Sequence, residues 1–268
     1  MSASENEAMR PKRRASRALF DVLAREASPE DQSSERNLLL SRLPESSYAS
    51  LVPHLEPISV SARQVAWRPE SRIHAVYFPR SAVFSLLTPL QRHSPVESAT
   101  VGCDGMIGVP VLLGVAASHS LAVVQIDGEA ARLDAERFRS WIAEQDEYTR
   151  SIFLRYSYVL LEQTAQSVAC NRKHALEERC ARWLLATRDR VAADEFPLTH
   201  EFLAAMLGVR RASVTVALGM LQQEGCLTYS RGRLKVLDAT GLEETSCECY
   251  RVIRTEQERI MGGASEMA

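Results

Sequence analysis

Residues 198–221 read LTHEFLAAMLGVRRASVTVALGML, and this stretch decides the fold of the C-terminal part of the chain. Apolar residues recur at helical spacing on both sides of Gly208, and glycine readily adopts the left-handed conformation that ends a helix. Thr199 is a predicted N-cap for the first helix, because its hydroxyl can accept a hydrogen bond from the first turn. We therefore expect two short helices joined by a glycine turn, the second of them over residues 210–222.

The second helix is predicted to bury one stripe, formed by Val214, Leu218 and Leu221, and to expose the opposite face. That exposed face begins with two arginines and continues with small and apolar side chains, which suits close approach to base edges in the major groove of DNA. We expect DNA contacts from Thr199, Arg210, Arg211, Ser213, Thr215, Val216, Arg231 and Arg233.

A hairpin is predicted directly after these helices. Apolar residues alternate over residues 225–237 around a tight turn at Arg231 and Gly232, so the hairpin would carry basic residues at its tip. Residues 197–237 have a formal charge of +3, whereas the rest of the chain sums to −5. A helix pair with a glycine turn could also be a core hairpin of helices, but the hairpin and the local positive charge together favour a DNA interface.

The whole chain of 268 residues, 46% of them hydrophobic, is long enough for two modest domains. We expect neither a membrane span nor a signal peptide. The expected location is therefore the cytoplasm. Six cysteines show no disulfide spacing, and Cys247 and Cys249 are the only close pair. Because no further ligands stand at matched spacing in the sequence, we expect ordinary thiols there and no metal.

The N-terminal part divides into a tail and a strand-rich domain. Residues 1–33 are polar and charged, with little apolar periodicity, and are expected to be a disordered tail. Residues 34–147 contain short strand-like segments separated by regularly spaced turns, which predicts a β-sandwich or jelly-roll barrel. The expected strands are 58–60, 64–67, 74–78, 82–87, 96–101, 122–126 and 130–133.

Helical periodicity then runs from residue 135 to about residue 169 without glycine or proline. Two adjoining apolar stripes need two packing partners: the barrel is one, and a second copy of the same helix is the natural other, although a monomer that buries the helix remains an alternative. The expected dimerisation residues are Tyr148, Ile152, Phe153, Tyr156, Val159 and Leu160. We expect a dimerisation helix and hinge over 148–172, a winged helix-turn-helix over 173–245, and a C-terminal helix and tail over 246–268. The chain after Asp238 is expected to contain one further helix, over residues 242–260.

This order of elements resembles the Crp/Fnr superfamily of bacterial transcription regulators over residues 36–245. The resemblance is strongest in residues 198–235, in EERCARWLL (177–185) and in HAVYFPRSAVFSL (74–86). It implies an α+β fold with a cyclic-nucleotide-binding-like β-roll, a long dimerisation helix and a winged helix-turn-helix. It also implies a homodimer that reads a palindromic operator in double-stranded DNA, with RNA polymerase as a partner.

The chain departs from the family pattern in the recognition helix. Arg211 matches the first arginine of the family motif, but Ala212 stands at its glutamate position and Val216 at its second arginine position. The family's consensus half-site therefore does not carry over.

The sensor domain also departs from the family. Val109 stands at the glutamate position of the phosphate cassette, and no arginine lies between residues 105 and 125, so a bound cyclic phosphate would lack its cation. An N-terminal cysteine cluster for iron–sulfur binding is missing because Cys103 is the first cysteine. Lone histidines near strand ends are usually solvated, so haem is not expected at His74, His93 or His119. We expect no cofactor, and an unknown effector with the candidate region Gly105, Met106, Ile107 and Gly108.

Two other classes of function come into consideration for this sequence. A small-molecule or signal-binding module with a vestigial DNA-binding domain fits the predicted barrel equally well. An enzyme is not expected, because the sequence contains no phosphate-binding glycine loop, nucleophile elbow, His-Glu-x-x-His motif or paired-carboxylate arrangement.

Overall fold

The computed structural model describes residues 37–92 and 94–262, so the predicted tail over 1–33 lies outside the described residues. Three short helical segments come first: η1 (Leu40–Arg42), α2 (Glu45–Leu51) and η2 (Val52–His54). Asn37 connects them to the rest of the fold, because its side-chain amide donates hydrogen bonds to the carbonyl oxygens of Pro79 and Gly105.

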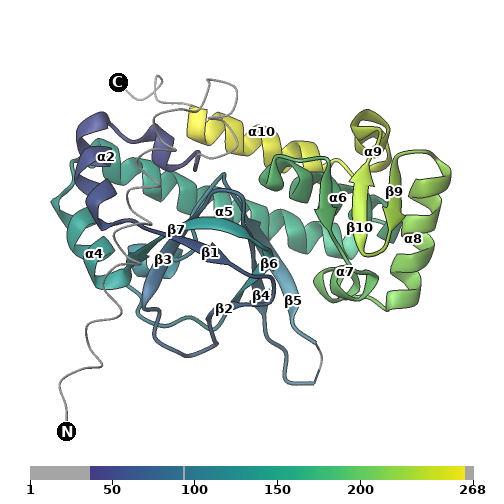
Figure 1. Ribbon diagram of the computed structural model, residues 1–268, viewed down its shortest axis with the longest axis horizontal. Helices are drawn as coiled ribbons and strands as arrows, with labels where there is room; N and C mark the ends of the chain where they lie inside the picture. Colours follow the sequence, from purple (N-terminus) through teal and green to yellow (C-terminus); the bar gives the residue numbers. More distant parts are fainter. Residues whose placement is uncertain (1–36, 93, 263–268) are drawn as a thin grey trace, which may run out of the picture. The chain divides into compact units, whose positions relative to one another are not determined.

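Two antiparallel sheets follow (Figure 1). The three-stranded sheet has the order β1-β7-β3, and the four-stranded sheet has the order β2-β6-β4-β5, with α3 (Val109–Leu112) between β5 and β6. Every predicted strand has a counterpart in the structure, because alternating apolar residues and turn residues are local signals. The bounds are β1 (Glu56–Val60), β2 (Val65–Trp67), β3 (Ala75–Pro79), β4 (Val83–Thr88), β5 (Val96–Val101), β6 (Leu121–Ile126) and β7 (Gly128–Asp134).

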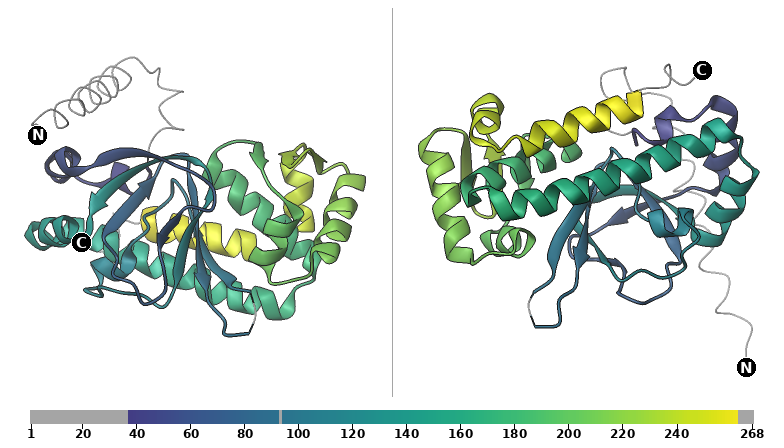
Figure 2. Two further views of the ribbon diagram at one scale, coloured as in Figure 1. Left: turned by 60° about the horizontal axis from the view of Figure 1, so that its bottom comes forward. Right: turned by 180° about the vertical axis from the view of Figure 1, so that it is seen from behind.

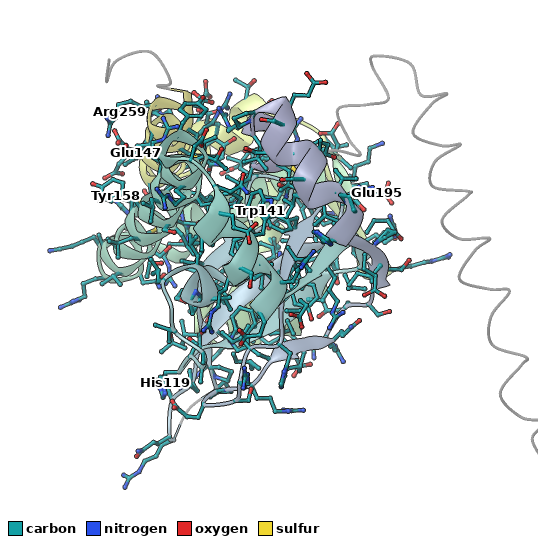
Figure 3. All side chains as sticks on the ribbon, turned by 90° about the vertical axis from the view of Figure 1, so that its left-hand side faces the viewer. His119, Trp141, Glu147, Tyr158, Glu195 and Arg259 are labelled. Atoms are coloured by element: carbon teal, nitrogen blue, oxygen red, sulfur yellow. The ribbon has the colours of Figure 1, made fainter. Side chains whose placement is uncertain are left out.

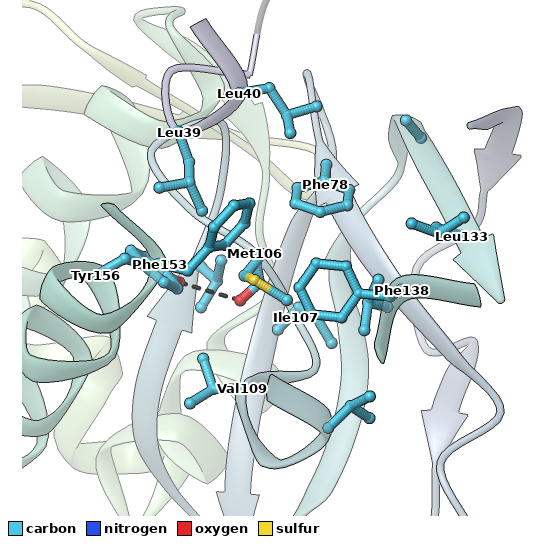
Figure 4. Packing of buried hydrophobic residues seen from close by; sticks show 14 of the residues in the cluster. Leu39, Leu40, Phe78, Met106, Ile107, Val109, Leu133, Phe138, Phe153 and Tyr156 are labelled. Atoms are coloured by element: carbon cyan, nitrogen blue, oxygen red, sulfur yellow. Dashed lines mark hydrogen bonds between the residues drawn. The ribbon is translucent and has the colours of Figure 1, made fainter. Parts of the chain in front are cut away.

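One hydrophobic core joins the two sheets to the helices that follow them. Phe138 lies at its centre, with its ring centroid 5.6 Å from that of Phe153 and 6.3 Å from that of Phe78 (Figure 4). The hydroxyl of Tyr156 donates a hydrogen bond to the carbonyl oxygen of Met106. Gly105 lies against the Tyr156 ring so closely that a Cβ there would come within 2.3 Å of it. The aromatic side chains thus hold the 105–108 loop against the long helix that follows the sheets.

The single helix expected from residue 135 is wrong, because the chain forms two helices, α4 (Ala135–Glu144) and α5 (Glu147–Lys173). Gln145 is extended, and the Asp146 carboxylate accepts a hydrogen bond of 2.7 Å from the backbone N–H of Thr149. An aspartate N-cap starts a new helix by satisfying a free N–H of its first turn. The N-cap, and not a glycine or proline, therefore sets the break.

The long helix α5 covers the sheets with one face, as the right-hand view of Figure 2 shows. Four of the residues expected at a dimer interface lie instead in the core of the same chain, where they are at most 6% exposed: Ile152, Phe153, Tyr156 and Val159. Leu160 packs partly against the same core, and Tyr148 is 46% exposed. Both apolar stripes that the sequence showed on α5 therefore contribute residues to the core beneath the helix, and neither of them is left free as a whole for a second chain.

The C-terminal part begins with α6 (Leu176–Val191), and a second hydrophobic core joins it to a helix pair and a small sheet. The helix pair is α7 (His200–Leu207) and α8 (Arg211–Gln223). The sheet has the order β8-β10-β9, where β9 (Leu227–Ser230) and β10 (Arg233–Val236) are the expected hairpin. The third strand, β8 (Glu195–Pro197), was not predicted, since three residues are too few to show alternation.

The helix expected over residues 242–260 is also wrong, because two helices are present, α9 (Ala239–Thr245) and α10 (Cys249–Gly262). Ser246 ends α9 in an extended conformation, and its hydroxyl donates a hydrogen bond to the carbonyl oxygen of Glu243. Serine side chains that bond the backbone in this way compete with helix continuation. The helix α10 runs along α5 (Figure 2). The domain boundaries that the sequence analysis gave stay predictions.

No single helix of the described part of the chain is long and apolar enough to cross a membrane. Only α7 and α8 taken together reach the required length and composition, and these two helices are bent by 107° relative to each other.

Candidate DNA-binding interface

The turn between α7 and α8 has the geometry that the sequence predicted. The Thr199 hydroxyl accepts a hydrogen bond of 3.1 Å from the N–H of Phe202 and so caps α7. Gly208 ends α7 with a φ of +66°, in the left-handed region that favours glycine. The 107° bend between the helices is typical of a helix-turn-helix, in which the second helix enters the major groove.

The two faces of α8 differ as predicted. Val214, Leu218 and Leu221 are at most 2% exposed and belong to the core shared with α6 and α7. The opposite face is open to solvent, including Val216, which is 61% exposed. The predicted contact residues of α8 and its N-cap that lie on this exposed face are Arg210, Arg211, Ser213, Thr215 and Val216.

Thr215 differs from the other exposed residues because its hydroxyl is already engaged. It donates a hydrogen bond to the carbonyl oxygen of Arg211 and lies 2.8 Å from Nδ1 of His200. Burial and the nearby Arg211 charge lower the pKa of His200. A neutral His200 that donates from Nδ1 satisfies both contacts, since the hydroxyl has one proton to give. The hydroxyl of Thr215 is therefore engaged within the protein, and its methyl group is the part of the side chain left for other contacts.

The hairpin forms the expected wing. Arg231 and Gly232 occupy its tip with φ values of +49° and +77°, which is typical of a two-residue hairpin turn. Arg233 does not have a free charge, because its Nε lies 2.5 Å from Oε1 of Glu195 on β8. This contact holds the pKa of the Glu195 carboxyl below its usual range. The sequence could not reveal the pairing, since it depends on the unpredicted strand.

Glu97 of β5 links the strand-rich part of the fold to α6. Its Oε1 accepts a hydrogen bond of 2.8 Å from the indole N–H of Trp183, and its Oε2 lies 2.5 Å from the Ser85 hydroxyl. Burial raises the pKa of the Glu97 carboxyl. Sequence reasoning missed this residue because a lone glutamate in a strand carries no distinctive pattern.

A polar cleft of about 440 Å³ lies where α5, α6 and α10 meet the loop after β5. Asp104 and Arg190 form an ion pair of 3.2 Å in it, and the side chain of Arg190 is only 7% exposed. The expected effector region lies beside this cleft in sequence, but Met106 and Ile107 are fully buried and Tyr156 packs on Gly105. An effector at residues 105–108 stays a prediction.

The prediction of no metal or cofactor is wrong in one respect. A group of three cysteines and one histidine could hold a metal ion, since their ligand atoms all lie within 4.8 Å of one another. The sequence showed only one half of the group, because the other half is about 75 residues away and arrives through packing. We call this group the cysteine–histidine cluster: Cys170, His174, Cys247 and Cys249.

Comparison with known proteins shows what the fold is similar to. Residues 178–245 match the family model of the Crp-like helix-turn-helix domain. The solved structure of FixK2 from Bradyrhizobium japonicum is 16% identical and covers 72% of this chain and 98% of that chain, with a TM-score of 0.62. No curated protein matches the chain.

Two regulators of Thermus thermophilus are similar as well. TTHB099, a transcriptional regulator of the CRP family, is 18% identical and covers 79% of this chain and 100% of that chain, with a TM-score of 0.58. TTHA1359, a transcriptional regulator of the CRP/FNR family, is 21% identical and covers 71% of this chain and 98% of that chain, with a TM-score of 0.57. The chain thus carries a Crp-like helix-turn-helix within the α+β fold of Crp/Fnr regulators, which confirms the resemblance.

Proposed function

We propose that this protein is a homodimeric transcription regulator that reads a two-fold symmetric DNA site with α8. One observation carries the proposal: an exposed, arginine-tipped α8 stands at 107° to α7 beside a basic wing. In a helix-turn-helix this arrangement places the N-terminal residues of the second helix against base edges. Two solved proteins with this fold are transcriptional regulators, which supports the proposed role in transcription.

The contacts divide into two kinds. Arg211, Ser213 and Thr215 lie on the exposed first turns of α8 and are the residues we propose for base reading. Arg231 lies at the tip of the wing and is suited to phosphates, which position the protein without selecting a sequence. Arg233 also lies on the wing, but its pairing with Glu195 would have to open before it contacts a phosphate. Arg210 is the N-cap of α8 and makes no side-chain capping bond. We assign it to neither the base-reading nor the phosphate-binding residues.

A second copy of the chain is proposed to pack on the outer face of α5. Exposed residues there alternate at spacings of four and three, which is the a/d pattern of a two-stranded coiled coil. Tyr158 lies at the outer edge of the α5 and α10 layer in Figure 3 and is 48% exposed. We call this face the α5 stripe: Leu154, Tyr158, Leu161, Ala165 and Val168.

Pairing with a second copy would explain why the α5 stripe exposes large apolar side chains on an otherwise polar helix. Leu161 and Val168 are 62% and 68% exposed, although α10 already covers the neighbouring face of α5. A contiguous apolar stripe of this kind marks a protein contact. Two-fold pairing along α5 would also give two copies of α8 the symmetry that a palindromic site needs.

The DNA-binding proposal is tested with Arg211→Ala. A duplex selected by the protein from a random library supplies the specific probe, and a scrambled duplex the non-specific one. A bidentate arginine–guanine contact contributes about 1–3 kcal/mol, so affinity for the selected duplex should fall roughly 5- to 150-fold. Affinity for the scrambled duplex should change far less.

The control for this test is Arg251→Ala, which removes an exposed arginine from α10, away from the proposed interface. It should leave both affinities unchanged. Equal losses on the two duplexes for Arg211→Ala would refute base reading by α8. Failure of the unaltered protein to select any duplex would refute the function itself.

Control by an effector is proposed to act through the polar cleft. Its volume of about 440 Å³ lies in the range of small-molecule sites, and arginines outnumber carboxylates along its walls, which suits an organic anion. A panel of nucleotides and organic acids should include a compound that raises the melting temperature. If none does so, and native mass spectrometry of protein from its host finds no retained molecule, this part of the proposal is refuted.

A further inference from the structure

The cysteine–histidine cluster assembles at the junction between α5 and α6. Cys170 lies on the last turn of α5, and His174 is the C-cap of that helix. The other two ligands flank Glu248, where the chain passes from α9 into α10. Segments about 75 residues apart in sequence thus bring four soft or borderline ligand atoms to one point.

The distances fit a single ion. The Sγ atoms of Cys170 and Cys247 are 3.5 Å apart, and Sγ of Cys249 is 3.4 Å from Nδ1 of His174. In a tetrahedral zinc site, bonds of about 2.3 Å to sulfur and about 2.1 Å to nitrogen separate two sulfurs by about 3.8 Å and sulfur from nitrogen by about 3.6 Å. An iron–sulfur cluster spreads its ligands around several irons, so four ligand atoms within 4.8 Å favour a mononuclear site.

The histidine is held in the orientation that a ligand needs. Its Nε2 lies 3.1 Å from Oε2 of Glu248, so the carboxylate stabilises the proton on Nε2 and leaves the Nδ1 lone pair facing the cysteines. A carboxylate on the far ring nitrogen is the usual outer partner of a metal-bound histidine. The Gln166 side-chain amide donates a further hydrogen bond of 3.0 Å to Sγ of Cys249.

Apolar packing does not account for the three cysteines. They are at most 4% exposed, yet they form a small cluster of their own, apart from both hydrophobic cores. Arg182 is 9% exposed, and its charge acts on Cys170 from α6. A nearby guanidinium offsets the net negative charge that three thiolates and one divalent cation would carry.

We propose that the cysteine–histidine cluster binds one zinc ion in a closed, tetrahedral Cys₃His site. Four protein ligands leave no open position for substrate, so the ion has a structural and conformational role. The ion would lie at the junction between two helices, because only two residues separate the end of α5 at Lys173 from the start of α6 at Leu176.

A bound ion would fix the winged helix-turn-helix relative to α5. It joins the end of α5 to the α9–α10 connection, and α9 packs on α6, the first helix of the C-terminal part. Loss of the ion would free this junction and lower the affinity of the dimer for its two half-sites. This consequence rests on the proposed DNA-binding function, whereas zinc binding itself does not.

The test uses the full chain, stripped with a chelator under reducing conditions and reloaded with zinc or cobalt(II). We expect one zinc per chain, and for cobalt the absorption bands of tetrahedral coordination with thiolate-to-metal charge transfer. Cys247→Ser and His174→Ala should lose the stoichiometric site, whereas His174→Cys should retain it, because four cysteines also form zinc sites. Glu248→Gln should weaken zinc binding roughly 10- to 100-fold through the lost support of the histidine.

Cys226→Ser is the matched control, since Cys226 is a buried cysteine of the C-terminal core outside the cluster. It should bind zinc as the unaltered chain does, and circular dichroism shows which variants are folded. An unaltered chain that takes up no zinc, an octahedral cobalt spectrum, or equal zinc loss in Cys226→Ser would overturn the proposal. So would a disulfide between Cys170 and Cys247 that persists in protein isolated under reducing conditions.

DNA binding is measured separately, so that the two proposals fail in different ways. Arg211→Ala should bind the selected duplex roughly 5- to 150-fold more weakly and keep its zinc. Removal of zinc from the unaltered chain should lower affinity for the selected duplex, and reloading should restore it. Zinc uptake without any effect on DNA binding would retain the metal site and refute the role of the ion at the junction.

Discussion

Leu161 lies at the middle of the α5 stripe, and replacing it by glutamine measures what this face contributes to dimer formation. Burying a whole leucine side chain stabilises a complex by about 1.5–3 kcal/mol. Since 62% of Leu161 is exposed in the single chain, its burial would contribute about 1–2 kcal/mol. A two-fold interface contains the residue twice, so Leu161→Gln should cost about 2–4 kcal/mol, or roughly 30- to 1000-fold in the dimer dissociation constant.

Sedimentation equilibrium over a range of concentrations gives this constant directly. Glutamine is a good helix former, so the change should leave α5 intact. Leu113→Gln is the matched control, because Leu113 is 58% exposed and follows α3, outside α5. An unchanged constant for Leu161→Gln, or an equal loss for Leu113→Gln, would refute pairing along the α5 stripe.

Three further predictions concern single contacts. Glu195→Gln should free Arg233 for phosphate contact, raise affinity for random duplex DNA, and steepen the slope of log affinity against log salt by up to about 1; lower affinity in fluorescence anisotropy would contradict this. Burial raises the pKa of the Glu97 carboxyl above its ordinary value of 4.5. Between pH 4.5 and the raised pKa, the folded state therefore holds a proton that the unfolded state has released. The free energy of unfolding of the unaltered chain, relative to Glu97→Gln, should therefore be highest near pH 4.5 and below and fall as pH rises through the folded-state pKa; a difference that is independent of pH in urea titrations would refute the reasoning. Thr199→Ala removes the cap of α7 and should cost about 1 kcal/mol of unfolding free energy in the same assay, whereas no change would show that the Phe202 N–H bond contributes nothing.

The sequence predicted those parts of the fold that depend on neighbours along the chain. Thr199, Gly208 and the buried stripe of α8 are local signals, and the structure has them where they were expected. The seven strands of the two sheets were also found. Short breaks were less visible: Asp146 divides one predicted helix and Ser246 another, because a polar residue that caps a helix looks the same in sequence as one that lies within it.

The candidate sites show the same division. The exposure of Arg211 and the turn at Arg231 follow from local periodicity, whereas the Glu195–Arg233 pair depends on a strand of three residues. Sequence spacing alone predicted no metal, because the Cys247–Cys249 pair has no further ligand nearby in the chain.

By itself, then, the amino-acid order determined a strand-rich domain, a long helix and a winged helix pair with an arginine-tipped recognition face. Apolar periodicity and turn residues are signals that extend over only a few positions, so they can be recognised in the sequence without knowledge of the packing. Only the tertiary structure decided which residues of α5 pack in the core, and which distant side chains meet beside the end of that helix. Whether a residue is buried depends on which other element packs over it, and the packing of the whole chain determines that element.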